Sequence, residues 1–216
     1  MGQLGVFLAD DHTVLRHGLR RIIDADPELQ VVGEAGDGHT AVDLVHQLRP
    51  AVVLMDIGLP LLNGIDATRL ITKSEPTVKV VILSMHADQA YVRRSLEAGA
   101  RGYVLKDAED LDLVRAIKAV ARGGSFFSPA VSELIRDGYL SPPGLEGRDD
   151  VDKLSDRERQ VLQLIAEGRV NKEIAVLLEV SLSTIESHRK RIMEKLDLHN
   201  TAALVRFAIR HRLVEA

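Results

Sequence analysis

The stretch LGVFLADD, residues 4–11, is an apolar run of strand length that ends in two adjacent aspartates. Further short apolar runs occur at residues 31–32, 51–55, 78–83 and 102–105, and segments with the spacing of amphipathic helices lie between them. Because buried parallel strands are nearly continuous apolar runs, this alternation predicts repeated strand–helix units on a parallel sheet. We therefore expect a doubly wound, five-stranded α/β domain with right-handed crossovers.

Composition excludes several classes of protein. Of the 216 residues, 45% are hydrophobic and 28% are charged, which is typical of globular domains and not of disordered polymers. The chain has no cysteine, so disulfides, thiolate metal sites and a cysteine nucleophile are excluded. No apolar stretch reaches the roughly 18 residues of a membrane span, and the first residues do not resemble a secretory signal. We expect a cytoplasmic protein with no membrane partner.

Charge divides the chain into two parts. Residues 1–150 carry 16 Lys+Arg against 22 Asp+Glu, a net charge of −6, whereas residues 151–216 carry 12 against 10, a net charge of +2. The stretch between them includes Pro142, Pro143 and Gly144 and is typical of an exposed linker. We expect one domain over residues 1–123, a linker with a short helix over 124–152, and a helical domain over 153–216. The positive charge of the last part is a weak indication of nucleic-acid binding.

Polar side chains follow the predicted strands of the first domain. They are Asp10 and Asp11, Asp56, Ser84 and Lys106. In an open parallel sheet, ligands bind at the carboxyl ends of the strands. Clustered carboxylates repel one another unless a cation lies among them, and hard oxygen ligands suit Mg²⁺. A carboxylate beside a metal, a lysine and a hydroxyl is equipped to accept a phosphoryl group. The alternative is that these acids are solvated loop residues or helix caps.

These residues resemble the receiver domains of two-component response regulators. The resemblance spans about residues 4–122 and rests on Asp10-Asp11, on Asp56-Ile-Gly-Leu-Pro60 with Gly64, on Ser84, and on Gly102-Tyr103-Val-Leu-Lys106. It implies that Asp56 is the phosphoacceptor. It also implies that Asp11 binds Mg²⁺ directly and Asp10 through water, with the carbonyl of Gly58 completing the metal site.

The same resemblance implies a two-state switch. Ser84 would hydrogen-bond the phosphoryl group and Lys106 would pair with it, while Tyr103 turns inward when Ser84 moves. The alternative for Tyr103 is an ordinary half-buried strand aromatic. Asp107 follows the lysine where proline is usual in the family, so the isomer of that peptide bond stays open. Ser84 stands where threonine is commoner, which the family pattern should tolerate. The histidines of the first domain, His12, His17, His39, His46 and His86, are expected to be surface or loop residues.

The last part of the chain has four predicted helices and no strand signal. Ser155 and Glu158 form a capping box at the start of the first helix, which stops at Gly168. The second begins at a cap on Asn171 and runs through Leu178. The third begins at Ser181 or Ser183 and runs to about Leu196, and the fourth begins at Asn200 and runs to about Arg212.

The third of these helices is basic on one face and apolar on another. It carries His188-Arg189-Lys190-Arg191 and Lys195, together with an apolar stripe of Ile185, Ile192 and Leu196. The stripe can dock on the second helix across a short turn, which is the geometry of a helix-turn-helix. Such a helix suits the major groove of DNA. The alternative is a solvated basic face on a small helical bundle.

Residues 153–215 resemble the LuxR/GerE-type DNA-binding domain. The resemblance rests on residues 154–162, 167–175 and 183–188, and on Lys195-Leu196 with Asn200-Thr201-Ala202. It implies base contacts from Glu186, Ser187 and Lys190. It implies phosphate contacts from Lys172, Thr184, Arg189 and Arg191. We favour Ser181 over Ser183 as the cap, since the family helix starts there and Glu186 is then free to accept from a cytosine amino group. Val170 departs from the small hydroxyl residue that is usual at its position.

Both resemblances together indicate a DNA-binding transcriptional response regulator of the NarL/FixJ type, not an enzyme. We expect Mg²⁺ as cofactor, a sensor histidine kinase that phosphorylates Asp56, and promoter half-sites of double-stranded DNA as partner. A homodimer is expected on phosphorylation, with apolar surface of the fourth helix as a candidate interface. The alternatives are a phosphorylation-independent regulator that keeps the receiver fold, an aspartate-nucleophile phosphohydrolase, and a flavodoxin-like cofactor binder.

Overall fold

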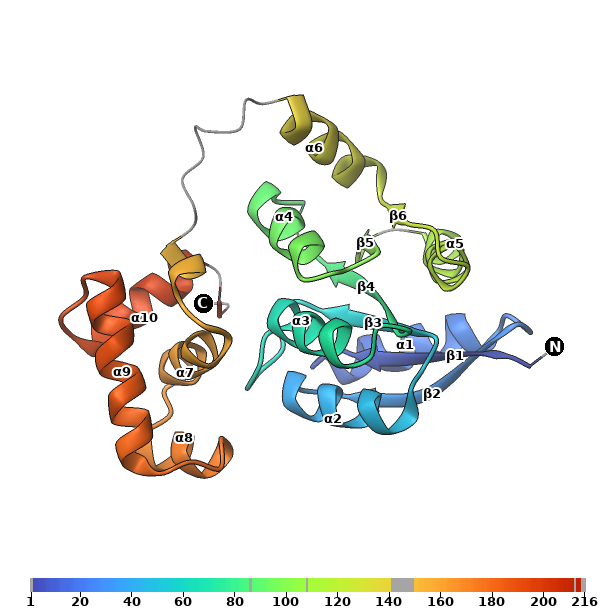
Figure 1. Ribbon diagram of the computed structural model, residues 1–216. Coiled ribbons are helices and arrows are strands. Elements are labelled where there is room, and N and C mark those ends of the chain that lie inside the picture. Colours follow the sequence, from blue (N-terminus) through green and yellow to red (C-terminus); the bar gives the residue numbers. More distant parts are fainter. Residues whose placement is uncertain (1, 86, 108, 141–149, 212, 215–216) are drawn as a thin grey trace. The chain divides into compact units, whose positions relative to one another are not determined.

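The structure, a computed structural model, describes residues 2–85, 87–107, 109–140, 150–211 and 213–214. These residues form two compact units, the first with elements β1 to α6 and the second with elements η1 to α10 (Figure 1). Some sequence predictions fall on His86, on residues 141–149 of the expected linker and on Arg212, which lie outside the described residues.

The first unit contains one parallel sheet. Its strands are β1 (Leu4–Ala9), β2 (Leu29–Ala35), β3 (Val52–Asp56), β4 (Lys79–Ser84), β5 (Gly102–Leu105) and β6 (Phe126–Phe127). They lie in the order β2-β1-β3-β4-β5-β6, so the five predicted strands form a doubly wound sheet as expected. The strand β2 is longer than predicted because its residues alternate between buried and exposed, as at an edge, and give only a short apolar run. The two-residue strand β6 adds a sixth member that is too short to give a sequence signal.

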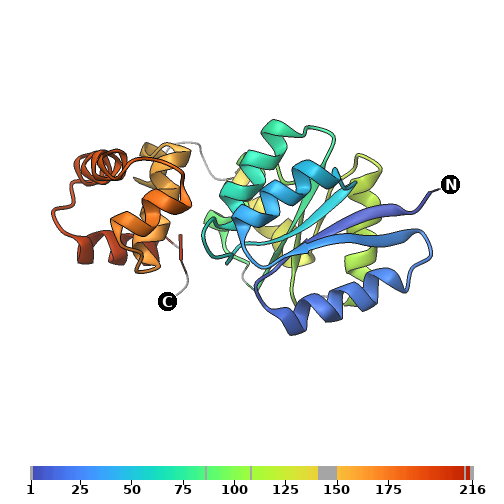
Figure 2. The ribbon, with the colours of Figure 1, turned by 90° about the horizontal axis from the view of Figure 1, so that it is seen from below.

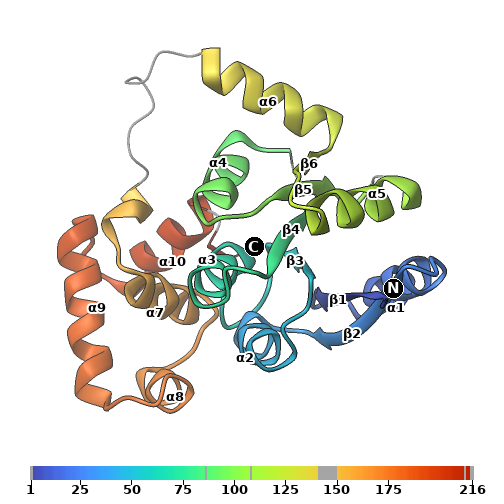
Figure 3. The ribbon, with the colours of Figure 1, turned by 45° about the vertical axis from the view of Figure 1, so that its right-hand side comes forward.

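Helices cover both faces of this sheet. The helices of this unit are α1 (Thr13–Asp24), α2 (Gly38–Leu48), α3 (Gly64–Ser74), α4 (Gln89–Glu97), α5 (Asp110–Ala121) and α6 (Pro129–Leu140). The helices α1 and α5 contact each other on one face, and α2, α3 and α4 cover the other (Figures 2 and 3). The helix α6 begins at Pro129, as proline at a first helical position allows, and contacts α4. Both β6 and α6 lie inside the segment expected as a linker, yet they belong to the first unit.

Alternate strand residues build the core beneath α1 and α5. Buried side chains of this core are Val6, Leu8, Val52, Leu54, Val81, Leu83 and Val104 from the sheet, Leu19 and Ile23 from α1, and Leu113, Ala116, Ile117 and Val120 from α5. Each helix contributes residues three or four apart, which is the spacing that places them on one face. The core therefore fixes the strands whose carboxyl ends carry the acidic residues.

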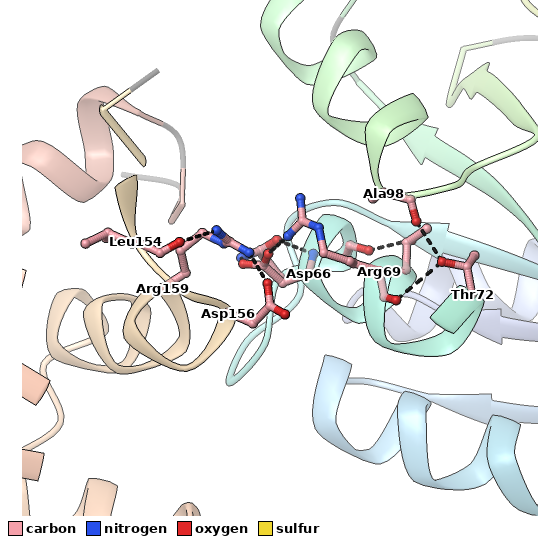
Figure 4. A network of polar contacts seen from close by, with 10 residues as sticks. Asp66, Arg69, Thr72, Ala98, Leu154, Asp156 and Arg159 are labelled. Carbon is pink, nitrogen blue, oxygen red and sulfur yellow. Dashed lines mark hydrogen bonds and ion pairs between the residues drawn. The ribbon is translucent and has the colours of Figure 1, made fainter. Parts of the chain in front are cut away.

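Polar contacts fix the ends of several helices. The side chains of Asp37, Asn63 and Asp88 accept backbone N–H groups at the starts of α2, α3 and α4. The hydroxyl of Thr72 on α3 donates to the carbonyl of Ala98 at 2.7 Å, which joins α3 to the end of α4 (Figure 4). These caps satisfy groups that the helices themselves leave unpaired.

The second unit is entirely helical over the described residues. It contains η1 (Asp150–Lys153), α7 (Asp156–Ala166), α8 (Asn171–Leu177), α9 (Leu182–Leu196) and α10 (Thr201–Arg210). The capping box of Ser155 and Glu158 is present at the start of α7, as predicted. Close by, the guanidinium of Arg159 hydrogen-bonds with the carbonyl of Leu154 at 2.7 Å and pairs with Asp156 (Figure 4). Among the described residues, no helix combines the length and the apolarity that a membrane crossing demands.

The helix α8 differs from prediction at its start. The prediction that Asn171 caps this helix is wrong, since Val170 occupies the N-cap and Asn171 is the first helical residue. Valine has no side-chain acceptor, so one half of a capping box remains, in which Glu173 accepts the Val170 amide at 3.0 Å. The side chain of Asn171 is used elsewhere, because it accepts a hydrogen bond from Arg189 at 3.2 Å.

Candidate functional site

The parallel register brings the acidic residues to one edge of the sheet. Ala9 pairs with Met55 across β1 and β3, so Asp10 and Asp56 come next along neighbouring strands. Both are buried, with 1% of Asp10 and 6% of Asp56 exposed. Asp56 pairs with Leu83 of β4, which places Ser84 one residue further along.

Lys106 joins the two buried carboxylates. Its Nζ lies 2.8 Å from Oδ2 of Asp10 and 2.8 Å from Oδ2 of Asp56. Its backbone amide donates to the carbonyl of Ser84 at 2.9 Å, and 8% of its side chain is exposed. Buried carboxylates so close together need a cation between them, and the ammonium supplies that charge. The structure thus brings together residues at the carboxyl ends of β1, β3, β4 and β5.

The electrostatics of this cluster follow from burial and pairing. Burial raises the pKa of the Asp56 carboxyl, Lys106 opposes that shift, and the carboxylates of Asp10 and Asp11 add to it. Burial also disfavours the ammonium of Lys106, but its hydrogen bonds with Asp10 and Asp56 outweigh this effect and raise its pKa. Lys106 is therefore cationic at neutral pH, and the charge on Asp56 is stabilised by its cationic neighbour.

The third carboxylate, Asp11, lies on the solvent side of the cluster. Its side chain is 38% exposed, and its Oδ1 lies 2.7 Å from Nδ1 of the exposed His12. One ligand atom from each of Asp10, Asp11, His12 and Asp56 lies within 4.8 Å of the others. Three carboxylates, of which Asp11 is open to water, fit Mg²⁺, which prefers oxygen ligands and keeps several waters. Gly58 lies in the bend that follows β3, and the role of its carbonyl stays a prediction.

Gly64 allows α3 to start directly beside the candidate phosphoacceptor. A Cβ atom at this position would lie 1.8 Å from the carbonyl oxygen of Asp56. The Gly64 amide donates to the carbonyl of Ile57 at 2.9 Å, and the Asn63 side chain accepts the amide of Asp66 at 3.0 Å. The backbone after β3 and the start of α3 are therefore in contact, which explains why a glycine stands here.

Ser84 and Tyr103 are hydrogen-bonded to each other in the interior. Ser84 is 3% exposed and Tyr103 is 0% exposed. Burial raises the pKa of Tyr103 to about 12, although the hydrogen bond with Ser84 lowers it. The Tyr103 ring therefore already lies in the interior in this structure, and its role as a switch stays a prediction. The peptide bond between Lys106 and Asp107 is trans, as are the other peptide bonds of the described residues.

The helices α8 and α9 form the helix-turn-helix. Ser181 is the N-cap of α9 and accepts the Thr184 amide at 3.1 Å, which confirms the favoured cap. Glu186 accordingly lies beyond the capping positions and is exposed. Ile185 and Ile192 are fully buried in the core that also holds Ile174 of α8. This docking leaves the opposite face of α9 to solvent.

The residues expected to contact DNA differ in exposure. Glu186, Ser187, Lys190, Arg191 and Lys172 are exposed, and Thr184 is half-buried. The side chain of Lys190 is 79% exposed, and its Nζ lies 3.8 Å from Oε1 of Glu194.

Arg189 is half-buried and held within the second unit. Its guanidinium donates to Oδ1 of Asn171 and to the hydroxyl of Thr201. It therefore links α9 to the starts of α8 and α10, which the sequence alone did not indicate.

The apolar residues of α10 are used mainly inside the second unit. Leu204, Phe207 and Ala208 are buried in its core, and the Phe207 ring stacks on His211 with centroids 4.1 Å apart. Ile209 remains exposed to 39%. The surface available for a two-fold interface on this helix is thus smaller than its sequence indicates.

Comparison with known proteins agrees with both parts of this architecture. Residues 6–118 match the family profile described as "Response regulator receiver domain", and residues 152–208 match "Bacterial regulatory proteins, luxR family". The transcriptional regulatory protein MctR of Rhizobium johnstonii is 39% identical over 212 residues, covering 98% of this chain and 96% of that protein. The chain belongs to the two-component response regulators of the NarL/FixJ type.

Other members of this response-regulator family align over nearly the full chain. The oxygen regulatory protein NreC of Staphylococcus carnosus is 37% identical over 97% of this chain and 99% of its own length. The response regulator RcsB of Salmonella enterica serovar Typhimurium, solved bound to a promoter with the phosphomimetic BeF3⁻, is 30% identical, with a TM-score of 0.59. That alignment covers 95% of this chain and 98% of the RcsB chain. The chain is therefore a transcriptional response regulator with a receiver and a DNA-binding domain.

Sequence reasoning missed two residues beside the receiver site of this response regulator. His12 is exposed, as expected of a surface or loop residue, but its Nδ1 also lies 2.7 Å from Oδ1 of Asp11, a contact that the sequence does not indicate. Arg16 donates to the carbonyl of Asp10 at 2.6 Å. Its position on α1, one turn after the two aspartates, is the signal that could have drawn attention to it.

Proposed function

We propose that a sensor histidine kinase phosphorylates Asp56, and that this phosphorylation controls dimerisation and promoter binding. The observation that carries the proposal is the position of the buried Asp56 carboxylate, 2.8 Å from Lys106 and adjacent to Asp10 and Asp11. A carboxylate in such a cluster has the nucleophile, the cations and the solvent exclusion that phosphoryl transfer requires.

The proposed phosphoryl transfer is a single displacement at phosphorus. A carboxylate oxygen of Asp56 attacks the phosphorus of a phosphohistidine, a P–O bond forms, and the P–N bond breaks with its electron pair leaving on the histidine. Lys106 would neutralise charge on the phosphoryl oxygens, and beforehand it favours the ionised form of Asp56 against the effect of burial. Mg²⁺, when bound by Asp11, Asp56 and the Gly58 carbonyl and through water by Asp10, would supply further positive charge at these oxygens.

We propose that Ser84 and Tyr103 convert this event into a change of shape. A phosphoryl group on Asp56 offers acceptor oxygens to the Ser84 hydroxyl, which otherwise hydrogen-bonds with Tyr103. The two acceptors compete for one hydroxyl, so phosphorylation biases the position of the Tyr103 ring. Tyr103 lies on β5, where it is paired with Phe127 of the edge strand β6.

The second unit is proposed to read DNA through the exposed face of α9. Glu186, Ser187 and Lys190 would contact base edges, and Lys172, Thr184, Arg189 and Arg191 would contact phosphates. Exposure of the first three and the burial of the opposite face support this assignment. RcsB, the relative that was solved on a promoter, covers almost the same length of chain.

We also propose the domain bounds, the dimeric state and the cellular location of this response regulator. We take residues 1–123 as the receiver, 124–152 as a linker with a short helix, of which β6 and α6 pack on the first unit, and 153–216 as the DNA-binding domain. Two copies would bind two half-sites when phosphorylated, as two-fold related operators require. The proposed role is regulation without turnover of a substrate, in the cytoplasm where promoters and kinases meet.

Phosphorylation of Asp56 is tested on the full chain. Incubation with acetyl phosphate and Mg²⁺ should label the wild type and leave Asp56→Asn unlabelled, as measured by intact mass. The Asp11→Asn variant serves as a control, because it keeps Asp56 and should label slowly. Undiminished labelling of Asp56→Asn would show that another residue is the acceptor.

The effect of phosphorylation on DNA binding is measured in a separate experiment. Fragments selected from random duplex DNA, with and without phosphodonor, give the preferred site and its affinity in each state. We expect tighter binding and a two-fold repeat with phosphodonor. Equal affinity in both states would instead identify a phosphorylation-independent regulator, and sustained turnover of phosphate esters would identify a phosphohydrolase.

A further inference from the structure

Arg16 holds the backbone of the loop that carries Asp10 and Asp11. Its Nη1 donates to the carbonyl oxygen of Asp10 at 2.6 Å, while its Nε lies 3.3 Å from Oε2 of Glu34. The side chain is 16% exposed and belongs to α1, whereas Glu34 belongs to β2. The guanidinium thus bridges the loop after β1 and the neighbouring edge strand.

Glu34 is itself held in place by a second arginine. Its Oε1 accepts from Nε of Arg20 at 2.5 Å, so the two oxygens serve two different guanidinium groups. Burial of Glu34 opposes its ionisation, but Arg20 and Arg16 outweigh this effect and lower its pKa. A carboxylate that stays ionised is a firm anchor for Arg16. Over the described residues, Arg20 forms no hydrogen bond or ion pair with the Asp10–Asp11 loop; it contacts Glu34 and also pairs with Asp24.

Both the backbone and the side chain of Asp10 are held by polar contacts. Its amide donates to the carbonyl of Ala35 at 3.1 Å, and its Oδ1 accepts the amide of His12 at 2.8 Å. Its Oδ2 faces Lys106 in the phosphoacceptor cluster, whereas its carbonyl oxygen receives Arg16. With the carbonyl fixed, the peptide plane between Asp10 and Asp11 is fixed too, and with it the direction in which both carboxylates leave the backbone.

We propose that Arg16 is a positioning residue for the cation site, which holds the Asp10–Asp11 loop in the conformation that directs its carboxylates toward Mg²⁺. This inference rests on the proposed function, since it takes Asp10 and Asp11 as the magnesium ligands. Residues that orient metal ligands without touching the metal commonly change metal affinity by about 10- to 100-fold when they are replaced. Arg16 acts through a single backbone carbonyl, so we expect the lower end of this range.

A purely structural role makes a different prediction. If Arg16 only fastens α1 to β2 through Glu34, then Arg20, which contacts the same carboxylate, should matter equally. Arg16→Met and Arg20→Met therefore form a matched pair, because each loses one guanidinium contact to Glu34 and only the first loses the contact to Asp10. Arg16→Lys keeps the charge and one set of donors, but a single ammonium cannot span both acceptors.

The experiment is a Mg²⁺ titration of the full chain, followed by backbone amide NMR shifts of residues 9–12, with thermal unfolding of each variant as the stability reference. We expect about 10-fold weaker Mg²⁺ binding in Arg16→Met, an intermediate value in Arg16→Lys, and wild-type affinity in Arg20→Met. Labelling of Asp56 in Arg16→Met should return toward the wild-type rate when Mg²⁺ is raised 10-fold.

Two results would overturn the inference. Wild-type affinity in both Arg16 variants would show that the loop needs no such support, and equal losses in Arg16→Met and Arg20→Met would assign the effect to the α1–β2 contact. Either result leaves the proposed magnesium site intact if the wild type binds Mg²⁺. A wild-type chain without Mg²⁺ affinity would instead refute the proposed site and this inference with it. Should Arg16→Met fail to fold, Arg16→Lys against Arg20→Lys makes the same comparison.

Discussion

The ammonium of Lys195 lies 2.6 Å from Oε2 of Glu158, and this pair joins the last turn of α9 to the first turn of α7. The same carboxylate oxygen accepts the Ser155 amide at 2.8 Å as part of the capping box. Glu158 is 3% exposed, so its charge depends on these partners. The carboxylate of Glu158 thus completes the capping box at the start of α7 and also holds the last turn of α9, the helix that is proposed to read DNA.

The neighbouring residue completes the arrangement. Arg157 donates to the carbonyl of Leu178, the C-cap of α8, at 2.6 Å. The first turn of α7 therefore holds the ends of both helices of the helix-turn-helix. Because an exposed recognition helix cannot be oriented by its outer face, contacts of this kind at its ends and inner face must orient it.

Replacing Lys195 by methionine tests this link. The change leaves the buried Glu158 carboxylate with the capping contact alone, and we expect the second domain to lose about 1–2 kcal/mol of stability at pH 7. Calorimetric unfolding of the full chain measures the loss. Lys190→Met is the control, since Lys190 and Glu194 form an exposed pair and its removal should change stability by less than about 0.5 kcal/mol. A similar loss in both variants would argue against a special role for the Glu158 pair.

The contribution of Glu158 should depend on pH in a defined direction. Burial acts to raise its pKa, but Lys195 and the Ser155 cap outweigh burial, so the pKa in the folded chain lies below its ordinary value. The resulting stabilisation is complete above the ordinary glutamate pKa, about 4.3, and is lost as pH falls through the lower folded value. The stability difference between wild type and Lys195→Met should therefore be constant from pH 7 to about 5 and shrink below about pH 4. A difference that grows on acidification would contradict this assignment.

Gly64→Ala should damage the receiver severely. The added Cβ would lie 1.8 Å from the carbonyl oxygen of Asp56, so α3 or the end of β3 must move, and we expect a loss of about 3 kcal/mol. Gly18→Ala is a matched control in α1, where nothing lies within 4 Å of the added atom and where alanine favours the helix by up to about 1 kcal/mol. Urea unfolding of both variants measures the contrast. Equal stability of the two would show that the backbone after Asp56 can yield.

The strands β1, β3, β4 and β5 and the acidic edge follow from local sequence, because each of these strands is an apolar run with a polar residue at its carboxyl end. The register then brings Asp10, Asp56 and Lys106 together without further information, since parallel strands in one sheet share their carboxyl edge. Helix starts were predictable where a side chain caps them, as at Ser155, Ser181 and Asn200. The start of α8 was not predictable, because its N-cap residue, Val170, has no side-chain acceptor.

The contacts that sequence could not reveal join residues far apart in the chain. Arg189 reads as a free basic group of α9, yet it is held by Asn171 and Thr201 from two other helices. Arg16 and Glu34 are ordinary surface types whose pairing depends on how α1 crosses to β2. The strand β6 has two residues, and its pairing with β5 arises from the fold and not from an apolar pattern.

Three substitutions on the second domain should separate its kinds of contact. Lys190→Ala should weaken binding to a selected duplex about 10-fold or more and affect a scrambled duplex less, because a contact to a base edge discriminates by about 1–3 kcal/mol. Lys172→Ala should weaken both duplexes alike and reduce the salt dependence by about one unit of slope. Arg189→Ala should weaken both duplexes and also lower stability, since its guanidinium links α9 to Asn171 and Thr201.

Fluorescence anisotropy over a range of salt concentrations, with thermal unfolding beside it, measures all three. The selected duplex comes from the random-sequence experiment, and the scrambled duplex has the same length and composition. Equal losses of Lys190→Ala on both duplexes would make Lys190 a phosphate contact. An Arg189→Ala variant that binds weakly at unchanged stability would show that the links to Asn171 and Thr201 add little stability and that this guanidinium acts mainly on DNA.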